Sequence, residues 1–310
     1  MSTEDPILVT GAEGFVGAHV VSELASHGHS VLAAYLSPPS APVTRWWHPD
    51  RDRITPVFLD VTDRYAAQRL LDDCAPGGII HAAAITDPST GSLSKVNLGG
   101  TKNVLGPSGP AVKVFVSTAS VYLDTETGSE PITEEDAVVS VPPCVEDWTY
   151  AQSKRAAELW AIERGGIHIA RIAACFGPLE RPTSNRTVMS LGYAAAQASR
   201  QSKRIEIEHG NLSDLTYVRD TARGIVSLLE VKSTSSIINI ATGSPVDLSD
   251  LVRAVNSHAT HANSETLRLS GYIRRSILDT RKLQSNGLSA QYSLRTAFQE
   301  YEDWLSHNDY

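Results

Sequence analysis

Short apolar runs alternate with longer helical patterns along the first half of the chain. Each run is rich in Val, Ile or Ala and is bounded by Gly, Pro or charged residues, as is typical of strands in a buried sheet. The predicted strands are Ile7–Val9, Gly28–Tyr35, Ile54–Asp60, Gly78–Ala84 and Val112–Ser117. The predicted helices are Ala18–Ala25, a helix that begins at Asp63, Val96–Leu105 and Tyr150–Arg164. Strands and helices alternating at this spacing predict an α/β fold with a doubly wound parallel sheet.

A glycine-rich turn joins the first predicted strand to the first predicted helix. Gly11 allows a tight turn, Gly14 lets the backbone approach a pyrophosphate, and Gly17 lets the helix pack closely on its strand. The N-terminus of the helix offers unpaired N–H groups and a favourable dipole to a negatively charged group. The turn therefore predicts a dinucleotide-binding site.

Composition and charge exclude several classes of protein. Of the 310 residues, 41% are hydrophobic and 20% charged, and the net charge is −8. Without a block of Lys and Arg, we expect neither a nucleic-acid partner nor a membrane surface. The three cysteines are too few and too scattered for a disulfide framework or a zinc site, so no metal is predicted. Acidic residues lead directly into the first strand, so we expect no signal peptide and a cytoplasmic location.

The end of the second predicted strand bears on the choice between NAD and NADP. An Asp or Glu at this place usually binds the adenosine ribose in folds selective for NAD, but here the residue is Tyr35. Without a carboxylate nothing repels a 2′-phosphate, although Arg45 is the first basic residue that follows, within a Pro-rich loop at 37–49. The pattern favours NADP slightly and leaves NAD open.

Two more strand ends carry candidate cofactor contacts. Asp60 ends the third strand, where an Asp commonly faces the adenine amino group, and the alternative is a cap for the helix that Asp63 begins. Small residues at Ala82, Ala83 and Ala84 would let a cofactor approach the fourth strand closely. His81, alone in an apolar setting, is interpreted as a packed core residue.

Hydroxyl and amine groups follow the fifth predicted strand. Thr118 lies at the carboxyl end of that strand, where open α/β sheets hold their ligands. Tyr150 and Lys154 lie four residues apart on a predicted helix and so share one face. An ammonium and a cationic nicotinamide nearby would lower the pKa of the phenol toward neutrality. Alternatively, Thr118 is a strand-end cap and Tyr150 with Lys154 an ordinary surface pair, but the order of these motifs favours catalysis.

Together these motifs resemble the extended short-chain dehydrogenase/reductase family of NAD-dependent epimerases and dehydratases, and the resemblance runs nearly end to end. It rests on the glycine turn, Asp60, His81–Ala84, Asn97, Gly100–Thr101, Thr118–Tyr122, Tyr150 with Lys154, Arg171–Pro178, Thr216–Asp220, Ile238–Gly243 and Asp279–Lys282. It implies a Rossmann-type domain at 1–177, with returns near 215–245, and a smaller substrate-binding region at 178–310.

The resemblance also assigns roles. Tyr150 would be the acid/base, Lys154 would hold the ribose and lower the pKa of the tyrosine, and Thr118 would hydrogen-bond the reacting oxygen. Asn97 would support the geometry of the site. The remaining cofactor contacts would come from the backbone of Phe15 and Val16 and from Asp60, Val61 and Ala82–Ala84, and the candidate substrate contacts are Thr86, Ser120, Asn185 and Arg186. A solvated loop is an equal alternative for Asn185 and Arg186.

Departures from the family pattern narrow the reaction. Dehydratases carry an Asp-Glu pair directly after the strand-five Thr, and decarboxylases keep the Glu, but here Ala119 and Ser120 stand there. Enzymes of UDP-sugars use an Arg shortly before the Thr-Tyr-Val stretch, where this chain has Asp214, which would repel a diphosphate. We therefore expect an NAD(P)-dependent dehydrogenase or reductase of a small secondary alcohol or ketone without a UDP group. The alternatives are a nucleotide-sugar 4-epimerase and a non-catalytic NADP-binding regulator.

The resemblance further implies a homodimer through the helix that carries Tyr150 and the helix before it. The run Ala156–Trp160 offers an apolar stripe for such contact, and burial in the chain's own core explains the stripe equally well.

Overall fold

The computed structural model describes residues 5–87, 89, 92–109, 111–122, 130–136, 138–145, 148–183, 186, 189–200, 204–207, 212–233, 235–244, 246–247, 266–269 and 277–308. Its centre is a seven-stranded sheet in the order β11-β6-β5-β4-β1-β2-β3, in which every neighbouring pair is parallel. The strands are β1 (Ile7–Thr10), β2 (Val31–Tyr35), β3 (Ile54–Phe58), β4 (Gly78–His81), β5 (Val112–Thr118), β6 (Ile167–Ile172) and β11 (Ile237–Ile240). The predicted doubly wound parallel sheet is confirmed.

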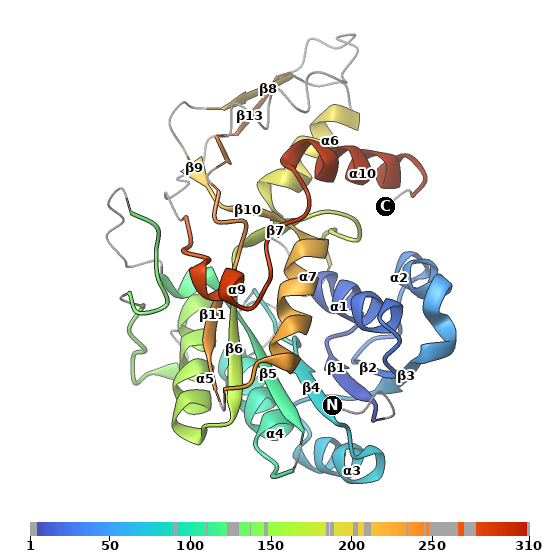
Figure 1. Ribbon diagram of the computed structural model, residues 1–310, viewed down its shortest axis with the longest axis vertical. Helices are drawn as coiled ribbons and strands as arrows, with labels where there is room; N and C mark the ends of the chain where they lie inside the picture. Colours follow the sequence, from blue (N-terminus) through green and yellow to red (C-terminus); the bar gives the residue numbers. More distant parts are fainter. Residues whose placement is uncertain are drawn as a thin grey trace.

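Helices cover both faces of this sheet because its strands are apolar on both sides (Figure 1). In β1, Ile7 and Val9 pack in the core shared with α1 (Phe15–Ser26) and α7 (Val218–Ser227). Leu8 faces the opposite core, which contains residues of α3 (Arg64–Cys74), α4 (Thr101–Leu105) and α5 (Tyr150–Arg164). The order of the strands reverses between β1 and β4, so a crevice is expected outside the carboxyl ends of these two strands.

A smaller group of elements lies beyond the carboxyl edge of the sheet. It comprises β7 (Ala174–Phe176) with β10 (Leu215–Tyr217), β9 (Leu212–Ser213) with β12 (Val246–Asp247), β8 (Arg204–Ile207) with β13 (Thr266–Leu269), and the helices α6 (Leu191–Arg200) and α10 (Leu294–Ser306). Phe176, Tyr217 and Phe298 join its apolar core, with the rings of Phe176 and Phe298 stacked 4.6 Å apart. The short helix α9 (Arg281–Ser285) returns to the large sheet beside β11 (Figure 1). The domain boundary at residue 177 stays a prediction.

The Pro-rich segment expected to be a loop contains a helix. The segment forms α2 (Ala41–Trp47), followed by the 3-10 turn η1 (His48–Arg53). Pro42 is tolerated because it lies in the first turn, where no intrahelical donor is lost. Val43 and Trp47 are buried against α1, and the Trp47 indole donates to the Ala18 carbonyl at 3.1 Å. The expectation was wrong because this apolar anchoring depends on α1 and outweighs the local preference of Pro for loops.

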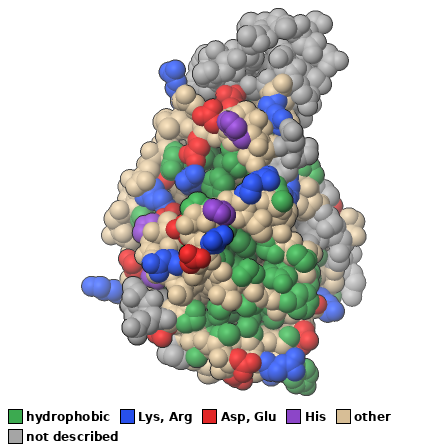
Figure 2. Space-filling view, turned by 90° about the vertical axis from the view of Figure 1, so that its right-hand side faces the viewer, with side chains coloured by type: hydrophobic (Ala, Val, Ile, Leu, Met, Phe, Trp, Pro, Cys, Tyr) green, Lys and Arg blue, Asp and Glu red, His purple; other side chains and the backbone are tan. Residues whose placement is uncertain are grey.

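Figure 2 shows the molecule from the side on which α2 and β3 lie in Figure 1, and hydrophobic side chains gather over the lower part of this face. Large exposed hydrophobic residues include Leu36 directly after β2, Phe58 at the end of β3 and Tyr65 at the start of α3. Strand β3 is the last of the sheet, so one of its edges is left without a neighbouring strand among the described residues.

Candidate active site

The glycine turn at the carboxyl end of β1 packs so closely on neighbouring backbone that any larger residue would collide with it. Gly11 has a φ of +67°, and a Cβ added to it would lie 2.8 Å from the backbone of Ala83. A Cβ on Gly17 would collide with the Gly11 carbonyl oxygen. Gly14 is the N-cap residue of α1 and no side chain caps this end, so the backbone at Phe15 and Val16 is available to an anion. These residues fit the pyrophosphate of a dinucleotide.

The carboxyl ends of β3 and β4 border the same crevice. Asp60 is half-buried, and its Oδ1 accepts the N–H and the hydroxyl of Thr62, each at 2.8 Å. Asp63 caps α3 by accepting from the N–H groups of Tyr65 and Ala66. The two acids thus have separate tasks, and Asp60 is not the cap. Val61 packs on Gly100, and Ala82, Ala83 and Ala84 are half-buried, directly after β4.

Asn97 ties three elements of the site together. It lies in η3 (Ser94–Gly100), a π-helical turn, which is a form frequently found at functional sites. Its side chain accepts from the N–H of Ile85 at 3.0 Å, donates to the Ile85 carbonyl at 3.0 Å and donates to Ser153 Oγ at 2.9 Å. The hydrogen bonds of the Asn97 side chain hold the segment after β4 against α5. We therefore expect Asn97 to act by positioning these elements.

Tyr150 and Thr118 are in contact at the carboxyl end of β5. Tyr150 is the first residue of α5, which begins with a capping box formed by Thr149 and Gln152. Burial raises the pKa of the Tyr150 phenol to about 12, against the opposing effects of the Arg186 charge and of a hydrogen bond with Thr118. The pKa is raised because desolvation of the phenolate outweighs the nearby charge. Its lowering by an ammonium together with a nicotinamide stays a prediction.

Lys154 lies one turn further along α5 and is buried, with 2% of its surface exposed. Its Nζ donates to the Val116 carbonyl at 2.5 Å and lies 4.3 Å from the centre of the Phe115 ring. Burial lowers the pKa of this amine to about 7, although the carboxylate of Glu158 opposes the shift. Lys154 thus contacts β5, and its expected effect on the pKa of Tyr150 stays a prediction.

His81 is a core residue, as interpreted from the sequence. Its ring is fully buried, stacks on Phe115, and bonds Thr10 Oγ1 through Nδ1 at 2.7 Å. Burial lowers the pKa of His81 to about 3, with Lys154 adding to the effect. The ring is therefore neutral at physiological pH.

Arg186 is brought to the site from the segment after β7. Its guanidinium donates to Glu180 Oε1 at 2.6 Å and lies 5.1 Å from the centre of the Phe15 ring. Its Nε is buried without a hydrogen-bond partner, and its charge acts on Tyr150. An unsatisfied buried donor is uncommon, and a substrate contact at Arg186 stays a prediction.

The other candidate substrate contacts lie at different distances from the reacting groups. Ser120 is next to the Thr118 hydroxyl: its N–H donates to Thr118 Oγ1 at 3.1 Å and its Oγ accepts from that oxygen at 3.2 Å. Thr86 is half-buried in the segment after β4. Asn185 lies outside the described residues.

Asp214 points into the protein, and the expectation that it would repel a diphosphate is wrong. The carboxylate is 1% exposed and accepts the N–H groups of Thr242 and Gly243 at 3.0 and 3.1 Å and the Thr242 hydroxyl at 2.7 Å. The hydrogen bonds of this carboxylate therefore join the start of β10 to the segment after β11. Arg219 is also occupied: it pairs with Glu300 and lies over the Trp46 ring.

A buried ion pair between Glu158 and Arg171 joins α5 to β6, one turn beyond Lys154. The sequence analysis did not predict it. Glu158, one turn beyond Lys154, receives two hydrogen bonds from Arg171 of β6, each at 2.9 Å, and one from Ser117 at 2.6 Å. Arg171 also donates to the Tyr122 hydroxyl at 2.8 Å. The available signal was the spacing of Tyr150, Lys154 and Glu158, which places all three on one face of the helix.

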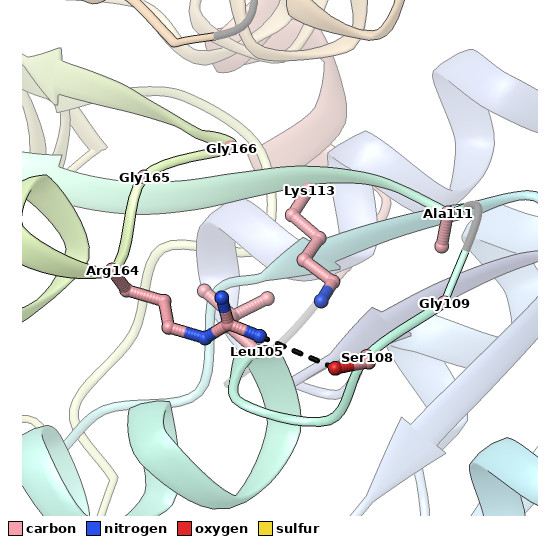
Figure 3. A pocket seen from close by; sticks show the side chains of 8 residues that line it. All are labelled: Leu105, Ser108, Gly109, Ala111, Lys113, Arg164, Gly165 and Gly166. Carbon is pink, nitrogen blue, oxygen red and sulfur yellow. Dashed lines mark hydrogen bonds between the residues drawn. The ribbon is translucent and has the colours of Figure 1, made fainter.

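A cavity of about 280 Å³ lies away from these residues, between the α4–β5 and α5–β6 connections (Figure 3). Its two cations already bond the surrounding backbone: Lys113 donates to the Pro107 carbonyl and Arg164 to the Gly106 carbonyl. Because it opens at the amino ends of the strands, it is not the ligand crevice of this sheet.

Among the described residues, no group of three or more His, Cys, Asp and Glu side chains could hold a metal ion. Within the same part of the chain, the longest apolar helical stretches are too short or too polar to cross a membrane.

Comparison with known proteins finds one family, whose members similar to this chain include decarboxylases, epimerases and reductases. A model of the NAD dependent epimerase/dehydratase family matches residues 7–241. A UDP-N-acetyl-alpha-D-glucosaminuronate decarboxylase of Bacillus cytotoxicus is 23% identical over 276 residues, covering 84% of this chain and 82% of the relative. A UDP-glucuronate 4-epimerase of Thermodesulfobacterium geofontis is 27% identical over 267 residues, covering 79% and 78%.

The fold is shared with solved structures. The UDP-glucose-4-epimerase of Stenotrophomonas maltophila, solved with bound NAD and formylated UDP-arabinopyranose, superposes with a TM-score of 0.80 at 21% identity, covering 98% of each chain.

Proposed function

Because the chain belongs to the NAD dependent epimerase/dehydratase family and is a nicotinamide-dependent enzyme of that type, we propose that it is a 4-epimerase of a sugar carried on a nucleotide. The observation that carries the proposal is the contact of Tyr150 with Thr118 beside a turn, η4 (Ala119–Tyr122), that has no acidic side chain. A dehydratase or decarboxylase of the pattern described above needs a carboxylate at that turn. Asp214 is buried and bonded to the backbone of Thr242, so our main argument against a UDP-linked substrate no longer holds.

The residues suggest how the reaction is divided. A bound nicotinamide dinucleotide would supply reversible hydride transfer. Tyr150 takes the proton of the sugar hydroxyl and later returns it, and Thr118 holds the reacting oxygen. Lys154 lies on the same face of α5 as Tyr150. It would exchange its hydrogen bond to the Val116 carbonyl for one to the ribose of the cofactor. The charge of Arg186 favours the phenolate, since it opposes the rise in the pKa of Tyr150.

Arg186 is our candidate for binding an acidic group of the substrate. Its Nε lacks a partner, and Phe15 and Glu180 hold the guanidinium in place. Arg219 resembles Arg186, because each arginine pairs with a glutamate and each has a buried Nε without a hydrogen-bond partner. Arg186 is preferred because its charge acts on Tyr150. Ser120, Thr86 and Asn185 stay predicted substrate contacts, and the cytoplasmic location stays a prediction.

The test is an assay of purified protein with UDP-glucuronate, UDP-glucose and UDP-N-acetylglucosamine in the presence of NAD. We expect inversion at C4, seen by NMR of the product, with no lasting rise in absorbance at 340 nm. Tyr150→Phe should lower the rate by about 10² to 10⁴-fold. Tyr65→Phe, a change on the exposed start of α3, is the matched control and should leave the rate unchanged.

The other outcomes identify other reactions. Accumulation of NADH with an oxidised product would show a dehydrogenase, which is the reaction expected from the sequence. Release of CO₂ would show a decarboxylase. No turnover by the wild type, together with full cellular function of Tyr150→Phe, would support the non-catalytic regulator.

A further inference from the structure

A carboxylate does stand at the end of β2, although the strand itself does not supply it. Glu13 belongs to the glycine turn, and its Oε1 accepts the N–H of Leu36, the first residue after β2, at 3.0 Å. Tyr35, the last residue of the strand, turns its ring against Phe58, with the ring centres 6.2 Å apart. The acid that seemed to be missing from the strand end therefore reaches that place from the neighbouring turn.

The second oxygen of this carboxylate has no partner. Glu13 Oε2 is buried and makes no hydrogen bond. A buried carboxylate oxygen without a donor is costly, so an occupant that supplies hydroxyl donors is favoured there. The vicinal hydroxyls of a ribose are such donors, and the Gly11–Gly17 cradle next to Glu13 is where the rest of the nucleotide would lie.

Two basic residues near β2 bond to groups other than Glu13, and Arg181 donates to Ser40 Oγ at 2.7 Å in the segment after β2. Arg45, the first basic residue after β2, donates to Asn308 Oδ1 at 3.1 Å, and Arg53 donates to the Gly28 carbonyl at the opposite end of the strand. A 2′-phosphate at this place would bring about −2 of charge against the carboxylate. The absence of an acid at Tyr35 therefore does not favour NADP.

We propose that Glu13 binds the adenosine ribose and makes the enzyme select NAD over NADP. The inference rests on the nicotinamide site of the proposed function and adds its specificity. It reverses the slight preference for NADP that the sequence pattern suggested.

The experiment is a fluorescence titration of the full chain with NADH and with NADPH, without substrate. Wild-type protein should bind NADH at least tenfold more tightly than NADPH. Glu13→Gln keeps the size of the side chain and removes its charge, so it should weaken NADH and strengthen NADPH until the two constants differ less than about threefold. Asp52→Asn makes the same charge change at a side chain that is 96% exposed and should keep the wild-type ratio.

The outcomes separate this inference from the proposed function. A ratio of NADH to NADPH affinity that is equal in wild type and Glu13→Gln would overturn the role of Glu13, as would tighter binding of NADPH by the wild type. Failure of both nucleotides to bind would overturn the nicotinamide site and the proposed function with it. Thermal unfolding of each variant with and without 1 mM NADH gives a second readout that does not depend on activity.

Discussion

Burial favours the neutral forms of both Tyr150 and Lys154, although it shifts their pKa values in opposite directions. Burial raises the pKa of Tyr150 to about 12 and lowers that of Lys154 to about 7. Desolvation disfavours whichever form is charged, so one cause accounts for both shifts. Both shifts therefore come from burial rather than from an interaction between the two residues.

The shifted pKa of Lys154 predicts a dependence of stability on pH. Its pKa is about 7 when folded and near 10.5 when unfolded, so between these values the unfolded chain binds more protons. The free energy of unfolding should therefore gain about 1 kcal/mol per pH unit from this group as the pH rises above 7. In Lys154→Met this gain disappears, and the difference in stability between variant and wild type should change across pH 7.0 to 8.5.

Urea unfolding without nucleotide at pH 7.0, 7.75 and 8.5 measures the effect. Lys102→Met, at an exposed position of α4, is the control and should follow the wild-type dependence on pH. Parallel curves for wild type and Lys154→Met would contradict the prediction.

At the scale of elements, α5 is held to β6 by charge as much as by apolar packing. Glu158 is fully buried and Arg171 is 2% exposed, and the pair is joined by two hydrogen bonds of 2.9 Å. The hydrogen bonds continue from Arg171 to the Tyr122 hydroxyl, which in turn donates to Asn239 of β11 at 2.9 Å. Helix α5 therefore carries its catalytic end in a position set by two strands and η4.

Breaking this buried pair should cost far more than breaking a pair near the surface. Glu158→Gln and Arg171→Met should each lower the free energy of unfolding by about 3 kcal/mol or more, because each leaves a buried partner uncompensated. The double variant Glu158→Gln/Arg171→Met should lose less than the sum of its two single changes. Arg155→Met removes a more exposed contact to the same carboxylate and should cost about 1 kcal/mol at most.

A double-mutant cycle measured by urea unfolding tests this expectation. Additive losses would show that the two side chains stabilise the fold independently, and the pair would then have no special part in positioning α5.

At the scale of the whole molecule, local pattern was enough for the sheet but not for the direction of its polar side chains. Alternating strands and helices predicted parallel pairing, and the strand-to-helix spacing located the glycine turn and Tyr150 with Lys154. The inward turn of Asp214 was not predictable, because its partners are N–H groups of Thr242 and Gly243, far away in the sequence. Glu13 likewise became informative only when its bond to Leu36 placed it beside β2.

The outer face of α5 leads to a prediction about assembly. Ala157 and Ala161 are fully buried, so the stripe considered from the sequence belongs partly to the chain's own core. Leu159 and Ile162, in contrast, are 46% and 48% exposed, and their spacing of three places them side by side on the helix. A two-fold contact of α5 with α5 of a second copy would cover both, which favours the homodimer.

Light scattering at micromolar concentration should therefore give twice the chain mass of 33.4 kDa for wild-type protein. Leu159→Glu/Ile162→Glu should halve that mass, because two carboxylates per chain would face each other across the contact. Phe58→Glu is the matched control, since Phe58 is 67% exposed on the edge strand β3 at the other end of the sheet. A monomeric wild type would contradict the dimer. Loss of the dimer in Phe58→Glu alone would instead place the contact at β3, where edge pairing and the exposed apolar residues would then be its cause.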